Sequence, residues 1–137
     1  MPDIWKKAKI LTSMYEAIGR ALAGESACPR IASFQAGYGL IDESGVEPLL
    51  LEIPPETDAI PGVVYEGVPE MIFSDGRTLA KCIIPESAVT DPQKVTVIGL
   101  FDQGNNLVAV LTFLPEWITP DKRYENYVYI EFPLEGQ

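Results

Sequence analysis

Two apolar runs between Lys94 and Phe113 constrain the fold more than any other feature of the chain. Valine, isoleucine, leucine and phenylalanine dominate both runs, and the polar segment 102–106, Asp-Gln-Gly-Asn-Asn, separates them. Branched and aromatic residues on either side of a short connection rich in Gly and Asn are typical of a β-hairpin. The segment therefore predicts two paired antiparallel strands joined by a turn at 102–106.

Other segments predict further strands. In 126–132, two sets of side chains alternate as in a half-exposed strand, with Tyr127, Tyr129 and Glu131 on one side and Val128, Ile130 and Phe132 on the other. Shorter strands are predicted at 28–39, 49–51, 63–65, 71–73 and 79–84, with 49–51 short and buried. Residues 74–76 predict a turn, and 115–120 an irregular crossing segment.

A single helix is predicted from Ser13 onwards. Ser13 followed by Glu16 has the form of a capping box, in which both side chains accept from exposed backbone N–H groups. Gly24 is suited to end the helix. The apolar residues of this segment share one face: Met14, Ile18, Ala21 and Leu22.

These elements predict the α+β class, with one N-terminal helix packed on a mainly antiparallel sheet. At 137 residues, 47% of them hydrophobic, residues 1–137 are expected to form a single domain. We interpret residues 1–11 as a possible extended arm. The segment 40–62 is rich in proline and is interpreted as a loop region.

The charge balance limits the partners. With 20 acidic and 10 basic residues the net charge is −10, which disfavours binding to nucleic acid and to anionic lipid. No window approaches the ~18 apolar residues of a membrane-spanning helix, so no membrane insertion is expected.

The residues that support chemistry are few. The chain has no histidine, which removes the commonest general base and a common metal ligand. Neighbouring carboxylates are expected to be solvated in loops: Asp42/Glu43, Glu56/Asp58, Glu66/Glu70 and Asp75. The segment 102–106 lacks the length and terminal Glu of a calcium loop, so a plain turn is preferred. We therefore predict no enzyme activity and no catalytic, cofactor-binding or metal-binding residues.

Two cysteines, Cys28 and Cys82, match no metal-ligand spacing. We interpret both as small buried apolar side chains, with a disulfide between them as the alternative.

Amphipathic aromatic side chains are the better candidates for a binding site, because such rings are enriched at protein interfaces. We predict that the interface residues are Trp5, Tyr65, Trp117, Tyr127 and Tyr129.

Several short sequences resemble the tail-collar fibre family of tailed bacteriophages. The resemblance rests on Ile-Gly-Leu-Phe-Asp at 98–102, Leu-Val-Ala-Val at 107–110, Phe-Leu-Pro-Glu-Trp at 113–117 and Thr-Pro at 119–120. Leu-Thr-Ser at 11–13, the segment 33–39, Val-Tyr-Glu at 64–66 and Ile-Ile-Pro-Glu at 83–86 precede them in the order of the family. At 66 the arginine of the family pattern is replaced by glutamate.

This resemblance implies a structural virion protein, either a tail fibre or an adaptor that attaches fibres to the baseplate. It implies baseplate and tail-fibre proteins as partners, a homotrimer or three copies per attachment point, and a place in the virion after synthesis in the bacterial cytoplasm. Because 121–137 contains neither heptads nor shaft repeats, we expect an adaptor or a collar decoration rather than a complete fibre. A receptor-binding or glycan-binding module of the tail tip is the alternative.

Overall fold

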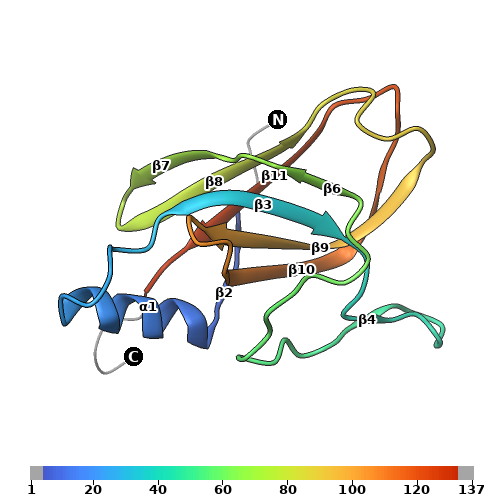
Figure 1. Cartoon of the computed structure of the whole chain (residues 1–137). Coiled ribbons are helices and arrows are strands. Elements are labelled where there is room, and N and C mark those ends of the chain that lie inside the picture. Colours follow the sequence, from blue (N-terminus) through green and yellow to red (C-terminus); the bar gives the residue numbers. More distant parts are fainter. Residues whose placement is uncertain (1–4, 133–137) are drawn as a thin grey trace.

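The computed structural model describes residues 5–132 and has two facing β-sheets with a helix at one end (Figure 1). Sheet A contains, in spatial order, β1 (Trp5–Lys7), β11 (Tyr124–Ile130), β8 (Arg77–Ile84) and β7 (Glu70–Ser74). Sheet B contains β2 (Lys9–Ile10), β10 (Leu107–Ile118), β9 (Gln93–Asp102), β3 (Ile31–Gly37) and β6 (Tyr65–Gly67). A small third sheet pairs β4 (Ile41–Asp42) with β5 (Leu49–Leu50), and the helix is α1 (Thr12–Leu22).

Among the described strands, all neighbours pair antiparallel except β1 and β11, which are parallel. This confirms the predicted α+β class with one helix and mainly antiparallel sheets. The hairpin expected between Lys94 and Phe113 is also confirmed, since β9 and β10 pair along most of their length.

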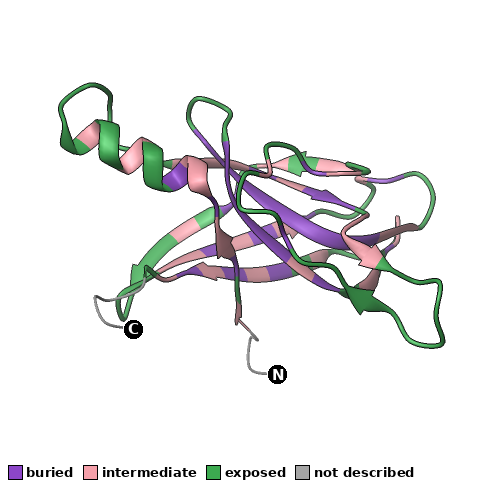
Figure 2. Cartoon of the chain, turned by 90° about the horizontal axis from the view of Figure 1, so that it is seen from below, coloured by how far each residue is buried: buried purple, intermediate pink, exposed green. Residues whose placement is uncertain are grey.

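The main core lies between the two sheets. Alternate residues of β8 and β11, such as Ala80, Ile84, Val128 and Ile130, are buried against Phe34 of sheet B. Burying each large apolar side chain contributes roughly 1.5–3 kcal/mol to stability. Figure 2 shows this burial along the strands, while α1 is a mixture of exposed and half-buried residues and the connecting loops are mostly exposed.

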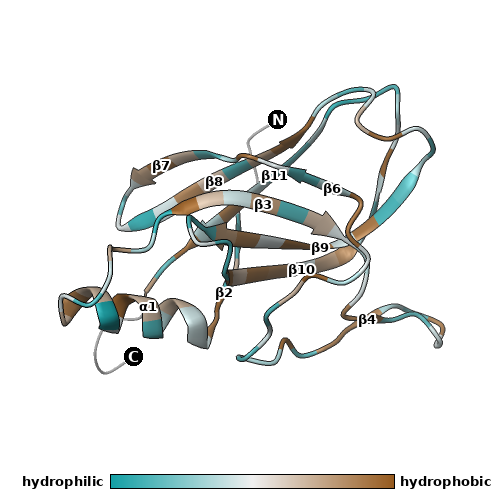
Figure 3. Ribbon diagram, in the orientation of Figure 1, coloured by the Kyte–Doolittle hydropathy of each residue, from teal (hydrophilic) through white to brown (hydrophobic). Residues whose placement is uncertain are grey.

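The outer face of sheet B has a cover of its own. Ile53 and Ile60, from the proline-rich segment, pack with Leu11 on this face in a second cluster of buried residues. Strands β9 and β10 are therefore buried on both faces, which explains their almost continuous hydrophobic colouring in Figure 3. The second half of the segment 40–62 therefore contributes buried side chains to the hydrophobic core.

Helix α1 differs from the expectation at its start. Its N-cap is Leu11 without a side-chain cap, and the Ser13 hydroxyl donates to the carbonyl of Leu107. The predicted capping box is therefore wrong, because Ser13 already lies inside the helix. Gly24 follows the last turn with a φ of 78°, as expected for a helix stop. The apolar face is only partly used: Met14 is buried, but Leu22 is 84% exposed.

Residues 5–10 form two short strands in different sheets rather than an extended arm. The chain crosses from sheet A to sheet B at Ala8, whose N–H donates to the carbonyl of Tyr129 over 2.9 Å. Ala8 is buried at this crossing. Residues 1–4 of the predicted arm lie outside the described residues.

Two local expectations are wrong. Residues 115–118 belong to β10 rather than to an irregular segment, because the strand register shifts between Thr112 and Glu116. This shift accommodates Pro115, which has no N–H to donate. Leu49 and Leu50 do form a strand, β5, but both are exposed rather than buried.

Candidate protein-docking surfaces

Three of the five predicted interface residues lie together on the outer face of sheet A. The parallel pairing of β1 with β11 places Trp5 opposite Tyr127, and their ring centres are 5.1 Å apart. Tyr129 lies on the same side of β11, because Asn126, Val128 and Ile130 point into the core. The predicted alternation along β11 is thus confirmed for Tyr127 and Tyr129.

Basic side chains of β8 lie beside these rings. The Arg77 guanidinium is 4.7 Å from the ring centre of Tyr129 and 3.0 Å from Glu131 Oε2. The Lys81 ammonium is 5.9 Å from the ring centre of Tyr127. Such contacts combine cation–π attraction with a local charge balance. We call these five side chains (Trp5, Arg77, Lys81, Tyr127 and Tyr129) the aromatic face.

Tyr65 and Trp117 lie elsewhere. Tyr65 is on β6 with its ring centre 5.9 Å from that of Phe34, so it packs against the core. Trp117 is on β10 and is 60% exposed. The Lys94 ammonium lies 6.0 Å from its ring centre and connects it to a polar network.

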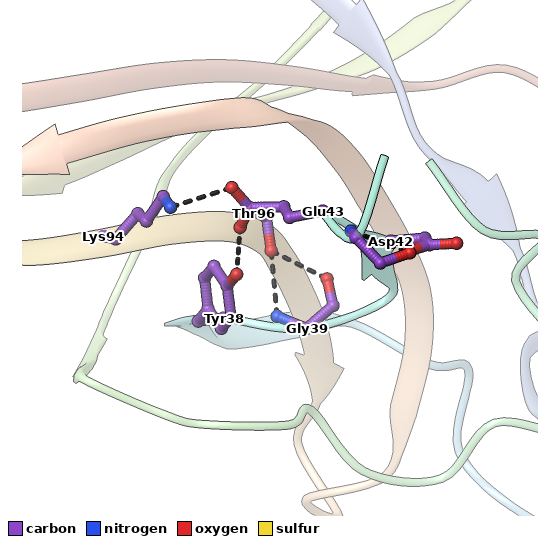
Figure 4. A network of polar contacts seen from close by, with 7 residues as sticks. Tyr38, Gly39, Asp42, Glu43, Lys94 and Thr96 are labelled. Carbon is purple, nitrogen blue, oxygen red and sulfur yellow. Dashed lines mark hydrogen bonds and ion pairs between the residues drawn. The ribbon is translucent and has the colours of Figure 1, made fainter. Parts of the chain in front are cut away.

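That network joins the start of the 40–62 segment to β9 (Figure 4). Glu43 accepts from the Tyr38 hydroxyl and from Lys94 Nζ, the latter at 2.9 Å. Deeper in, the buried Thr96 hydroxyl donates to the Gly39 carbonyl at 2.7 Å and accepts from the Gly39 N–H at 2.9 Å. We call these five residues the loop clamp.

The electrostatics of the loop clamp fit a structural pairing. The Tyr38 hydroxyl and then Lys94 hold the pKa of Glu43 below its usual value. The same carboxylate raises the pKa of Tyr38 and of Lys94. Each group is thereby kept in its usual charge state, and none is prepared to exchange a proton near neutral pH.

The loop clamp fixes a hairpin with unusual exposure. Between β4 and β5 the chain turns back, and four large apolar side chains project from it: Val46, Leu49, Leu50 and Leu51. We call residues 41–51 the leucine hairpin. It lies in a strongly acidic stretch, since no Lys or Arg occurs between Arg30 and Arg77. The sequence contains the signal, but three consecutive leucines predict a buried strand rather than an exposed one.

A second apolar surface lies at the other end of the sheets, between α1 and β7 (Figure 1). It is a groove of about 380 Å³ lined by apolar side chains that include Met14, Ile18, Ile31, Met71, Phe73 and Phe132. Among the described residues, Arg30 is the only charged side chain in its lining. We call it the end groove, and the sequence reasoning missed it because its walls come from four separate segments.

The other candidate groups have mainly structural partners. Asp102 accepts from the N–H groups of Gly104 and Asn106, both at 2.9 Å, so 102–106 is a hairpin turn. Glu66 accepts from Gln35 at 2.7 Å. Glu56 and Asp58 line a hollow of about 200 Å³.

The cysteine interpretation is only half right. Cys82 is buried, as predicted, but Cys28 is exposed in the loop before β3. Both are free thiols, so the alternative of a disulfide between them is wrong.

Within residues 5–132, no group of three or more acidic or cysteine side chains is arranged to hold a metal ion. The described helix is neither long nor apolar enough to cross a membrane. The chain matches no protein-family model, and no curated protein or solved structure is detectably similar to it.

Proposed function

We propose that this chain is a non-enzymatic structural protein of a phage tail, an adaptor that attaches fibres to the baseplate. The observation that carries the proposal is the leucine hairpin, which exposes apolar side chains on a segment fixed by the loop clamp. Together with the sequence resemblance, it supports a docking role in the virion. Synthesis in the host cytoplasm follows from the resemblance alone.

The physical argument is one of complementarity. Removing Leu49 and Leu51 from water in a complex favours binding by about 25 cal/mol per Å² of apolar area buried. The Lys94–Glu43 ion pair fixes the start of the turn between β4 and β5 before binding, which reduces the entropy lost on association. Acidic side chains around the leucines favour a partner whose apolar pocket has a basic rim.

The aromatic face favours a second candidate function, recognition of a host glycan. Trp5 and Tyr127 present neighbouring rings on an open sheet, and such rings bind amphipathic ligands. Specific and saturable binding to a glycan array, lost in Trp5→Ala, would support this function over the adaptor.

The experiment for the adaptor is a pull-down with tagged protein from lysate of phage-infected cells, with bound proteins identified by mass spectrometry. We expect baseplate and fibre proteins with the wild type, and their loss with Leu49→Ser/Leu51→Ser. The matched control is Leu22→Ser, because Leu22 is also exposed but lies on α1 at the other end. Equal recovery by all three proteins would contradict the role of the hairpin. Recovery of host envelope components alone would favour receptor binding.

A further inference from the structure

Strand β7 forms one outer edge of sheet A and is less protected than the opposite edge: its protective residues are Glu70 and the preceding Pro69. Exposed edge strands are templates for pairing with another chain, and proteins protect them with Lys, Pro or very short strands. The opposite edge, β1, is three residues long and includes Lys6 and Lys7. In contrast, β7 has five residues, Glu-Met-Ile-Phe-Ser, without Lys or Pro. Its Ile72 and Phe73 are 49% and 74% exposed.

The turn after β7 fixes which backbone groups face this edge. Asp75 and Gly76 both have positive φ, 53° and 77°, and form a two-residue turn between Ser74 and Arg77. Residues that flank such a turn form a hydrogen-bonded pair, and pairs of this kind alternate along the ladder. Ser74, Ile72 and Glu70 therefore direct their N–H and C=O groups towards β8. Met71 and Phe73 direct theirs to the outer edge.

We propose that β7 pairs antiparallel with β7 of a second copy of this chain, about a twofold axis beside Ile72. In this register Ile72 lies opposite Ile72 of the second copy, and Met71 lies opposite Phe73. Since Met71 and Phe73 both direct their backbone groups outwards, each such pair is a hydrogen-bonded pair of the new ladder. The two four-stranded sheets then become one continuous sheet.

The side chains complement themselves in this register. On the outer face, Leu79 lies beside Ile72 within the chain, so the pairing creates an unbroken apolar row of Leu79, Ile72 and their counterparts. On the inner face, Phe73 comes to lie beside Met71 of the second copy, next to the end groove. Apolar pairs facing each other across strands stabilise a sheet.

The charges are also complementary. Glu70 lies opposite Lys81 within the chain, and in the pair it faces Ser74 of the second copy, whose other neighbour is Arg77. The row across the interface is thus Lys81, Glu70, Ser74, Arg77, with no like charges opposite each other. This self-complementarity is what selects a second copy as the occupant of the edge.

The net charge of −10 opposes self-association at long range, so moderate salt should strengthen the pair.

The pairing is independent of the leucine hairpin and goes beyond the proposed adaptor role. It also differs from the three copies that the family resemblance implies, because a twofold interface closes after two chains.

The test is the mass of the full chain in solution, by light scattering after size exclusion over a concentration series. We expect twice the chain mass of 15.1 kDa at high concentration. Ile72→Lys and Ile72→Glu should each be monomeric, because like charges then face each other at the axis. An equal mixture of the two should restore the dimer, because only a twofold register sets residue 72 opposite itself.

A second pair of variants separates the contribution of the backbone N–H of residue 73 to the dimer from that of its side chain. Phe73→Ala removes the ring but keeps the outward N–H, whereas Phe73→Pro removes both and leaves the ladder to β8 intact. We expect a weakened dimer with the first and none with the second, while circular dichroism shows both folded. Leu22→Lys, an exposed charge on α1, and Leu49→Ser/Leu51→Ser should remain dimeric.

A wild-type monomer at every concentration, or a trimer, would overturn the pairing. A dimer that persists in Ile72→Lys, or a mixture that stays monomeric, would equally do so. None of these outcomes depends on partners in the lysate, so the adaptor role can fail or hold separately.

Discussion

Lys94 Nζ and Glu43 Oε2 lie 2.9 Å apart, although the two residues are 51 positions apart in the chain. One belongs to the central strand β9 and the other follows β4, so the ion pair ties the leucine hairpin to the sheet. The Tyr38 hydroxyl binds the same carboxylate, which makes Glu43 the common point of the loop clamp. The ionised Glu43 therefore helps to hold the leucine hairpin on the sheet, beside the Thr96–Gly39 hydrogen bonds.

The first prediction concerns pH. The folded state lowers the pKa of Glu43 from its usual value of 4.5, through the Tyr38 hydroxyl and Lys94. Its contribution to the free energy of unfolding is fully present above the unfolded pKa and is lost as the pH falls through the folded pKa. Urea unfolding on both sides of pH 4.5 should therefore show stability falling with acid.

Glu43→Gln should be less stable than the wild type at neutral pH and should show a shallower fall in acid. Some fall should remain, because Ser44 lowers the pKa of Asp42 in the same way. Asp42→Asn is the control for the part that comes from Asp42, since Thr119 also lowers the pKa of Asp121. An unchanged pH profile in Glu43→Gln would show that the ion pair does not form in solution.

The second prediction concerns the close approach of β3 to the proline-rich segment. A Cβ atom on Gly37 would lie 2.2 Å from the Pro61 carbonyl oxygen, which also accepts from the Tyr38 N–H. Gly37→Ala should lower the free energy of unfolding by about 1–3 kcal/mol, because the backbone must move to relieve the clash. Urea unfolding measures the change.

Gly19→Ala is the matched control, since a Cβ there has nothing within 4 Å and lies inside α1. It should leave stability unchanged or raise it by roughly 0.5–1 kcal/mol, through the better helix propensity of alanine. Equal stability of Gly37→Ala and the wild type would mean that Pro61 does not contact β3.

The third prediction separates the two thiols. Burial raises the pKa of the Cys82 thiol to about 12, and its side chain is 1% exposed. Cys28 is exposed. In a mildly alkaline buffer, an aromatic disulfide reagent should therefore titrate one thiol in the folded protein and both in denaturant.

Cys28→Ser should give no reaction while folded and one equivalent after unfolding. If the reagent detected no thiol in either the folded or the denatured wild type before reduction, the two cysteines would be joined in a disulfide.

The parts of the fold that the sequence predicted are those with a strong local signal. Segment 94–113 and the alternation around Tyr129 each repeat a pattern over many residues, and Gly24 ends a helix by its own geometry. The assignment of residues 5–10 to two sheets had no such signal, because strands of two or three residues show no periodicity. The sequence does not predict the full length of β10, because a proline such as Pro115 usually ends a strand.

The candidate surfaces were predictable to a smaller extent. Tyr127 and Tyr129 share a face through alternation alone, but Trp5 joins them only by the parallel pairing of distant strands. Tyr65 packs inwards for a tertiary reason, its contact with Phe34. The end groove and the exposed edge of β7 depend on which strand lies last in the sheet, and no local pattern specifies that order.

The last prediction concerns a buried hydroxyl of β11. The Tyr124 hydroxyl donates to the Glu116 carboxylate and accepts from Asn126 Nδ2 at 2.8 Å, and Asn126 is buried. Burial and then this carboxylate raise the pKa of Tyr124. Tyr124→Phe leaves the Asn126 amide without its acceptor, so the free energy of unfolding should fall by about 1–3 kcal/mol. Tyr127→Phe is the matched control, because its hydroxyl makes the same type of bond to Glu125 at the surface and should change stability by no more than about 0.5 kcal/mol. Urea unfolding of both variants decides the matter, and equal losses would show that the Tyr124 hydroxyl is as well solvated as that of Tyr127.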